Sequence, residues 1–488
     1  MGSSLSRREF IRRAGAVYAG FAVTSYSALQ AETRSSDRRP KRPNILLAIA
    51  DDWSWPHAGV YGDKVVKTPF FDKLATQGIL FTNSFCAAPT CTASRGAILT
   101  GQAPHRLGEG ANLHSTLSAK FRVYPDVLEA AGYFVGCSGK GWGPGIAEIG
   151  GWKRNPAGPQ FKSFADFLDQ VPDGKPFCFW YGSKEPHRPY QPGSGLKSGM
   201  RVEDVEVPGF LPDTPEVRSD ILDYYYEVQL FDKQVGDLLA ELDARGLSEN
   251  TLVVVTSDNG MPFPRAKANL YECGTHMPLA VRWPARIKGK RTVDAPVSHC
   301  DLAPTFLEAA GIHPLPEMTG RSLLGILLGE NGDDRDMVFT ERERHANVRK
   351  GDLSYPCRAV RTRQFLYIRN FCPERWPAGD PEMYVAVGSF GDIDTSPSKS
   401  VILHRRDDPK IARFFRLACE KRPAEELYDI RKDPWNLKNL ADSQEHAGIL
   451  REMRARLERW MSDTGDPRAV NPQDDRWDKY PYYGNPGK

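Results

Sequence analysis

The run "NILLAIADD", residues 44–52, is the stretch of sequence that decides the fold. An uninterrupted apolar run follows Asn44 and ends in two carboxylates, Asp51 and Asp52. Apolar runs of this length are typical of strands that are buried on both faces, as in a parallel sheet. The sequence therefore predicts a central strand here, with both carboxylates at its carboxyl end.

The same pattern recurs in "TLVVVTSDNG", residues 251–260, where Asp258 and Asn259 follow a β-branched run. Further strands are predicted within residues 132–141 and 176–187, and helical patterns, including one long helix, lie between the strands. This alternation predicts an α/β fold, a sandwich with a large, mostly parallel central sheet flanked by helices. In such sheets, ligands gather at the carboxyl ends of the strands.

The pattern of the sequence changes near residue 345. Short strand-like segments and turns follow, and a helical pattern covers residues 445–463. We therefore predict a larger domain over residues 44–344 and a smaller C-terminal α+β domain with an antiparallel sheet over residues 345–488.

The N-terminus has the layout of an export signal. The basic stretch "SRREFIRR", residues 6–13, precedes an uncharged, moderately apolar stretch that ends in small residues at Ala31. This layout resembles a bacterial twin-arginine signal peptide over residues 1–31, followed by a charged linker over residues 32–43. Since residues 1–31 hold four arginines and one glutamate, they account for the whole chain's net charge of +3. We expect a periplasmic or secreted bacterial protein, without a nucleic-acid partner and without a stable membrane span.

The polar residues at the two strand ends offer hard oxygen ligands, from three carboxylates and one amide: Asp51, Asp52, Asp258 and Asn259. Such ligands suit Ca²⁺ or Mg²⁺. Zinc would require histidines or thiolates at close spacing, which the sequence lacks. One acidic pair alone is more typical of a turn or a helix cap, but two pairs at parallel strand ends predict a site for one divalent cation.

Four basic residues follow or neighbour the same predicted strand ends, and they are Arg95, Lys140, His187 and Lys267. Each alone is more typical of a solvent-exposed side chain. Together with a divalent cation they would form a pocket for a tetrahedral dianion and stabilise charge that develops during a reaction.

The segment "CTASR", residues 91–95, begins a predicted helix. Residues four apart share a helix face, so Arg95 is expected beside Cys91, close to the positive end of the helix dipole. A half-buried structural thiol is the alternative for a single cysteine. The other eight cysteines form no CxxC pair, and they predict no particular disulfide pairing even in an oxidising compartment.

The longer segment "CTASRGAILTG", residues 91–101, resembles the signature of the formylglycine-dependent sulfatases, members of the alkaline-phosphatase superfamily. The segments "RPNILLAIADD", "TSDNG" and "ELYDIRKDPWNLKNLA" occur in the family's order, and the resemblance spans about residues 42–460. The segment "TSDNGMPFPRAKANLY" resembles the sulfamidase branch, the heparan N-sulfatases, most closely. The resemblance implies an alkaline-phosphatase-like sandwich and hydrolysis of sulfate esters or sulfamates on carbohydrates.

The resemblance also implies a role for each residue of the predicted site. Cys91 would be oxidised to formylglycine by a formylglycine-generating or equivalent maturase, and its hydrate would attack sulfur. Arg95, Lys140, His187 and Lys267 match the family's anion-binding and acid/base positions, with His187 as proton donor to the leaving group. The metal ligands would be Asp51, Asp52, Asp258, Asn259 and the modified residue 91, and we favour Ca²⁺ over Mg²⁺ as the ion.

Position 142 departs from the family pattern, because related proteins carry a histidine there and this chain has Trp142. Trp142 is a candidate apolar wall for a sugar ring. In the segment that joins the two predicted domains, His345 and Arg358 are candidate sugar contacts, because domain junctions often form ligand pockets. For His345 a solvated charged linker is an equally good interpretation.

Two other functions use the same residues. A phosphodiester or phosphonate hydrolase would suit the same anion pocket, but the complete cysteine signature argues against it. A non-catalytic glycan-binding relative would be expected to lack a metal ligand or Arg95, and the sequence retains all of them. The sugar, the sulfate position, exo or endo action and the oligomeric state do not follow from the sequence.

Overall fold

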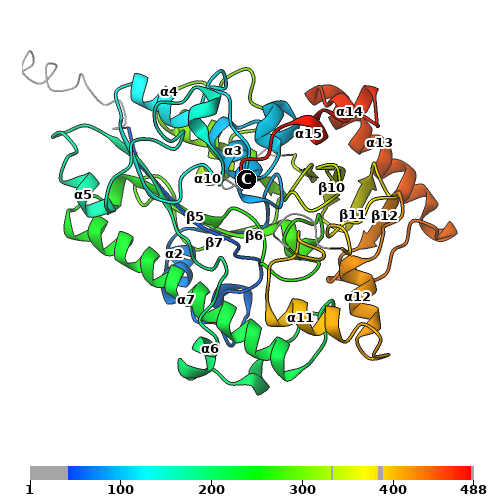
Figure 1. Ribbon diagram of the computed structural model, residues 1–488. Coiled ribbons are helices and arrows are strands. Elements are labelled where there is room, and N and C mark those ends of the chain that lie inside the picture. Colours follow the sequence, from blue (N-terminus) through cyan, green and yellow to red (C-terminus); the bar gives the residue numbers. More distant parts are fainter. Residues whose placement is uncertain (1–41, 331–333, 383–387, 485–488) are drawn as a thin grey trace, which may run out of the picture. The chain divides into compact units, whose positions relative to one another are not determined.

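The computed structural model describes residues 42–330, 334–382 and 388–484. The predicted signal peptide and almost all of the predicted linker lie outside these residues. From residue 43 onward, the described residues form one compact unit that contains two sheets, and Figure 1 shows both. Among the described residues, no helix combines the length and the apolar composition that crossing a bilayer requires.

The larger sheet contains eight strands in the order β3-β4-β1-β5-β6-β2-β7, with β8 also paired to β2. Strand β6 is antiparallel to both neighbours, and the other pairs are parallel. The predicted mostly parallel sheet is therefore confirmed. Its strands are β1 (Asn44–Ala50), β2 (Ile79–Phe85), β3 (Phe134–Gly139), β4 (Phe177–Gly182), β5 (Thr251–Ser257), β6 (His276–Arg282), β7 (Arg291–Val293) and β8 (Val297–Ser298).

Both faces of β1 are buried, because successive strand residues point to opposite sides of the sheet. Leu46 and Ala48 belong to the core under α2 (Pro69–Gln77) and α7 (Pro215–Ala244). The intervening residues Ile45, Leu47 and Ile49 belong to the opposite core, under α3 (Cys91–Thr100), α4 (Tyr124–Ala130) and α9 (Leu302–Ala309). This explains why the run at 44–50 is apolar without alternation.

The long predicted helix is α7, which Figure 1 shows crossing one side of the sheet. Thr214 caps its first turn by accepting a hydrogen bond from the backbone N–H of Val217, and Gly246 follows its end with φ of 65°. Shorter helices of the same region are α5 (Phe164–Leu168), α6 (Ser194–Lys197), α8 (Glu272–Thr275) and α10 (Leu324–Leu328).

The smaller sheet is antiparallel, in the order β12-β11-β10-β9. Its first strand in the chain precedes residue 345, where the sequence predicts the domain boundary. The division into two domains stays a prediction. The apolar side of α13 packs on Val360 and Tyr367 of this sheet. The elements are β9 (Met337–Arg342), β10 (Cys357–Thr362), β11 (Phe365–Asn370), β12 (Glu425–Asp429), α11 (Pro397–His404), α12 (Ala412–Cys419), α13 (Ala447–Thr464), α14 (Pro467–Val470) and α15 (Arg476–Lys479).

All nine cysteines lie within the described residues, where each is buried and none forms a disulfide. Several belong to the apolar cores on the two faces of the larger sheet. They therefore act mainly as small apolar side chains.

The ends of β3 and β4 fit together without space for an extra side chain. The backbone N–H of Lys140 donates to the carbonyl of Gly182 at 2.8 Å, and a Cβ added at Gly182 would lie 1.8 Å from the carbonyl oxygen of Lys140. We predict that Gly182→Ala displaces Lys140 and costs about 1–3 kcal/mol of unfolding free energy, measured by urea denaturation.

Gly448→Ala is the matched control, because a Cβ at this position in α13 meets no atom within 4 Å. It should leave stability unchanged or raise it by about 0.5–1 kcal/mol. Equal stability of the two variants would show that the junction of β3 and β4 is not tightly packed.

Candidate active site

Four neighbouring parallel strands bring polar side chains to one edge of the larger sheet. Because β3, β4, β1 and β5 run in the same direction, their carboxyl ends meet there. Residues 51–52 follow β1 and residues 258–259 follow β5, while Lys140 follows β3 and His187 lies shortly after β4. The structure thus brings together the strand-end residues that the sequence predicts.

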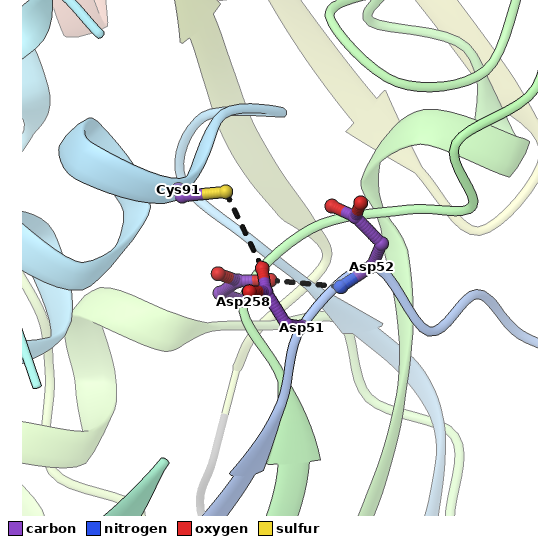
Figure 2. Close-up of side chains that lie close together, drawn as sticks. All are labelled: Asp51, Asp52, Cys91 and Asp258. Carbon is purple, nitrogen blue, oxygen red and sulfur yellow. Dashed lines mark hydrogen bonds between the residues drawn. The ribbon is translucent and has the colours of Figure 1, made fainter. Parts of the chain in front are cut away.

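Helix α3 presents Cys91 to this edge, as its first residue and directly after the extended Thr90. Cys91 is 2 % exposed, and its Sγ lies 3.4 Å from Oδ1 of Asp51 (Figure 2). One ligand atom each from Cys91, Asp51, Asp52 and Asp258 lie within 4.8 Å of one another. The backbone N–H of Asp52 donates to Asp258, which fixes the two strand ends to each other (Figure 2).

The donor set fits a hard divalent cation. Three carboxylates converge, and Asn259 lies beside them with its Nδ2 donating to Oδ1 of Asp52 at 2.6 Å. The amide oxygen of Asn259 is buried and accepts no hydrogen bond from the described residues. A buried amide oxygen without a donor is costly, and a cation bound by that oxygen would remove the cost.

Arg95 is fully buried and is held from two sides. Its Nε donates to Oδ2 of Asp258 at 2.8 Å, and its Nη1 donates to the carbonyl oxygens of Lys140 and Gly141. Its Nη2 lies 3.9 Å from Oδ1 of Asp51 and makes no hydrogen bond with the described residues. The guanidinium therefore keeps one free donor group for an anion.

Two lysines each pair with a different carboxylate of the cluster. Lys140 Nζ lies 2.6 Å from Oδ2 of Asp51, and Lys267 Nζ lies 2.8 Å from Oδ2 of Asp52. Lys267 also contacts Oδ2 of Asp394 at 3.2 Å. Asp394 was missed by the sequence reasoning, because it follows no predicted strand and belongs to no motif quoted above.

His187 is the most exposed basic side chain at the cluster, at 38 %, and its Nε2 lies 3.9 Å from Oδ2 of Asp52. Its Nδ1 lies 2.5 Å from the carbonyl oxygen of Arg188, so Nδ1 must carry a proton. Nε2 is then the nitrogen that is free to face a ligand.

Burial and neighbouring charges determine the protonation of the cluster. Burial raises the pKa of Asp51, but the charges of Lys140 and Arg95 outweigh it and hold the pKa well below its usual range. Burial also raises the pKa of the Cys91 thiol well above its usual value, more strongly than Lys140 lowers it. An unmodified Cys91 is therefore a neutral thiol at pH 7 and a poor nucleophile.

A cavity of about 500 Å³ opens beside the cluster and is lined in part by Asp51, Lys140 and His187. Its wall also includes His114, which the sequence reasoning did not single out. His114 lies in a loop after α3, far from any predicted strand end, so no local sequence signal identifies it.

The three candidate sugar contacts are all buried. Trp142 is 4 % exposed and belongs to the apolar core around α3 and α4, so its ring is not a free wall. His345 lies beside the site, with Nδ1 2.8 Å from Oγ1 of Thr90, and burial lowers its pKa to about 3. Arg358 is fully buried and paired with Glu343 and Asp466, which leaves it no exposed surface for a sugar.

Comparison with known proteins gives two family matches. The sulfatase family model matches residues 43–312, and a model described as N-sulphoglucosamine sulphohydrolase, C-terminal, matches residues 265–380. Human N-sulphoglucosamine sulphohydrolase is 32 % identical over 89 % of this chain and 93 % of that protein. An ulvan-active sulfatase of Formosa agariphila is 28 % identical over 90 % of this chain and 78 % of that protein.

Solved structures share the fold. A protein in complex with its substrate D-glucosamine-2-N,6-O-disulfate has a TM-score of 0.64 at 19 % identity, over 88 % of this chain and all of that one. At this identity the likeness supports the α/β sandwich with its second, antiparallel sheet.

The placement of Arg358 changes the expected effect of its replacement. Its guanidinium lies 2.6 Å from Asp466 and 2.8 Å from Glu343, and all three side chains are buried. Arg358→Ala would leave these carboxylates without their partner, so we predict a loss of about 3–5 kcal/mol of unfolding free energy in urea denaturation.

Arg122→Ala is the control, because Arg122 forms an exposed ion pair with Glu317. It should hardly change the denaturation midpoint. An Arg358→Ala variant with parental stability and a selective loss of activity on sulfated sugars would restore Arg358 as a sugar contact.

Proposed function

This chain belongs to the sulfatase family, and from that premise we propose that it hydrolyses sulfate groups on carbohydrates with a formylglycine made from Cys91. The position of Cys91 is the observation that carries the proposal. Its residue begins α3, and its side chain lies against Asp51, inside a cluster of three carboxylates and the three positively charged side chains that pair with them. A neutral thiol has little use there, whereas an oxygen nucleophile would benefit from each of these charges.

A divalent cation, Ca²⁺ in preference to Mg²⁺, is part of the proposal. Asp51, Asp52, Asp258, Asn259 and the modified residue 91 would hold it, and it would supply electrostatic stabilisation of negatively charged oxygens. With Asp394 included, four carboxylates face Arg95, Lys140 and Lys267, so a divalent cation would change the local net charge from −1 to +1. A positive site suits a sulfate anion.

The basic residues would bind the sulfate group, neutralise its charge and protonate the leaving group. The free Nη2 of Arg95 would bind a sulfate oxygen, and Lys140 and Lys267 would neutralise charge on either side of the group. His187 would protonate the leaving-group oxygen or nitrogen through Nε2, since its Nδ1 is held by the carbonyl of Arg188.

Sulfated sugars are the proposed substrate class. One related protein is named for N-sulphoglucosamine and another for ulvan, and they support a sulfamate or a sulfate ester on a carbohydrate. The cavity of about 500 Å³ beside the cluster has a volume that suits one or two sugar units.

Export and maturation complete the proposal. The segment "SRREFIRR" and the apolar stretch after it support twin-arginine export to the periplasm or beyond. Since such signals carry folded proteins, a formylglycine-generating or equivalent maturase would act before export, in the cytoplasm.

A panel of defined N- and O-sulfated mono- and disaccharides tests the function, with released sulfate measured by ion chromatography. A phosphonate monoester serves as the competing substrate. We expect kcat/KM for one sulfated sugar to exceed that for the phosphonate by at least about 100-fold, because the family match and the cysteine signature favour sulfate, although the charge of the pocket alone would accept either anion. A phosphonate hydrolysed faster than every sulfated compound would contradict the proposal.

Conversion of Cys91 gives a second, independent test. Purified protein that was coexpressed with a maturase should yield a peptide in which the thiol sulfur of residue 91 is replaced by an aldehyde oxygen. Peptide mass spectrometry measures this change, and Cys86, which is also buried, serves as the internal control that stays a thiol. Fully active enzyme with an unmodified thiol at residue 91 would overturn the mechanism.

A further inference from the structure

His114 lines the active-site cavity without a role in the proposed function. It is half-buried, and it shares the cavity wall with Asp51, Lys140 and His187. Its backbone φ of 50° lies in the left-handed region, which a residue with a Cβ seldom adopts. Strain of this kind persists only when the surrounding structure enforces it.

The C-terminal segment, residues 480–484, contacts both the backbone and the ring of His114. The backbone N–H of Tyr483 donates to the carbonyl oxygen of His114 at 2.7 Å. The ring of Tyr482 packs edge-on against the imidazole of His114, with 5.3 Å between ring centroids. Figure 1 shows this red segment running from α15 toward α3.

Arg344 anchors the C-terminal segment in turn. Its Nη2 donates to the carbonyl oxygens of Tyr480 and Pro481 at 2.7 and 3.0 Å, and its carbonyl accepts from the N–H of Leu113 at 3.0 Å. Arg344 is almost completely buried and therefore has few alternative positions. Arg344 thus ties the C-terminal segment, through its side chain, and the loop of His114, through its backbone carbonyl, together.

We propose that His114 is a substrate-contacting residue that selects for the sugar, and that the C-terminal segment holds its imidazole in the cavity. This inference rests on the proposed function, because it assigns the sugar side of the same site. His114 would hydrogen-bond an uncharged hydroxyl or N–H of the sugar, next to the charged groups that bind sulfate.

The charges around His114 favour a contact with an uncharged group of the sugar and not with the sulfate. Burial, followed by the charges of Lys140 and Lys267, lowers the pKa of His114 to about 4. At pH 6–8 its imidazole is neutral, with one donor and one acceptor nitrogen. A neutral ring adds no further charge to the sulfate site, and it suits a sugar hydroxyl better than an anion.

The experiment measures sugar binding in a Cys91→Ala background, where the sugar is not hydrolysed. The probes are glucosamine N-sulfate, glucosamine 6-O-sulfate and inorganic sulfate, titrated by calorimetry in the presence of Ca²⁺. His114→Ala should raise the Kd of at least one sulfated sugar by tenfold or more, and the Kd of inorganic sulfate by less than threefold. Equal changes for sugar and sulfate, or failure of both sugars to bind the background protein, would overturn the assignment of His114.

A pair of variants at Tyr483 tests the C-terminal segment. Tyr483→Pro removes the backbone N–H that donates a hydrogen bond to the carbonyl oxygen of His114, whereas Tyr483→Ala keeps this N–H. We expect the proline variant to weaken sugar binding at least fivefold relative to the alanine variant, with an unchanged Tm. Equal affinities of the two variants would refute the holding role.

Activity measurements distinguish a failure of this inference from a failure of the proposed function. Wild-type enzyme that hydrolyses no sulfated compound refutes the proposed function, while the binding measurements still decide the role of His114. In active enzyme, His114→Ala should lower kcat/KM for the sugar at least tenfold more than for 4-nitrocatechol sulfate, which has no sugar to contact. Equal losses on the two substrates would count against a sugar contact.

Discussion

The mutual repulsion of three buried carboxylates is the constraint on which the site depends. Asp51, Asp52 and Asp258 share a small volume from which water is almost excluded. Each negative charge there raises the free energy of the others unless positive charge offsets it. Arg95, Lys140 and Lys267 supply that charge, at 2.8 Å or less from their carboxylate partners.

The fold meets this constraint through the parallel sheet and one helix. Four parallel strands end at one edge, so residues far apart in sequence arrive with their backbones already fixed by ladder hydrogen bonds. Helix α3 then adds Cys91 beside Asp51 and Arg95 beside Asp258. The chemistry therefore depends on rigid elements, and loops supply the cavity wall.

The sequence predicts the strand-end acids and the bases at Lys140 and His187 because their signal is local: an apolar strand followed by polar residues. The signature at Cys91 gives the family for a similar reason. His114 and Asp394 are different, because only long-range packing brings their loops to the site. Arg358 and Trp142 are a charged and an aromatic residue close to predicted functional segments, but ion pairs bury Arg358 and apolar neighbours bury Trp142. The sequence alone does not reveal such burial.

The central claim is that the carboxylate cluster binds one divalent cation beside residue 91. Anomalous diffraction from crystals of active enzyme grown with Ca²⁺ tests it most directly. The account predicts a single anomalous peak about 2.3–2.6 Å from oxygens of Asp51, Asp52, Asp258 and Asn259. Crystals of active enzyme without that peak, and with Lys140 and Lys267 still paired to Asp51 and Asp52, would contradict it.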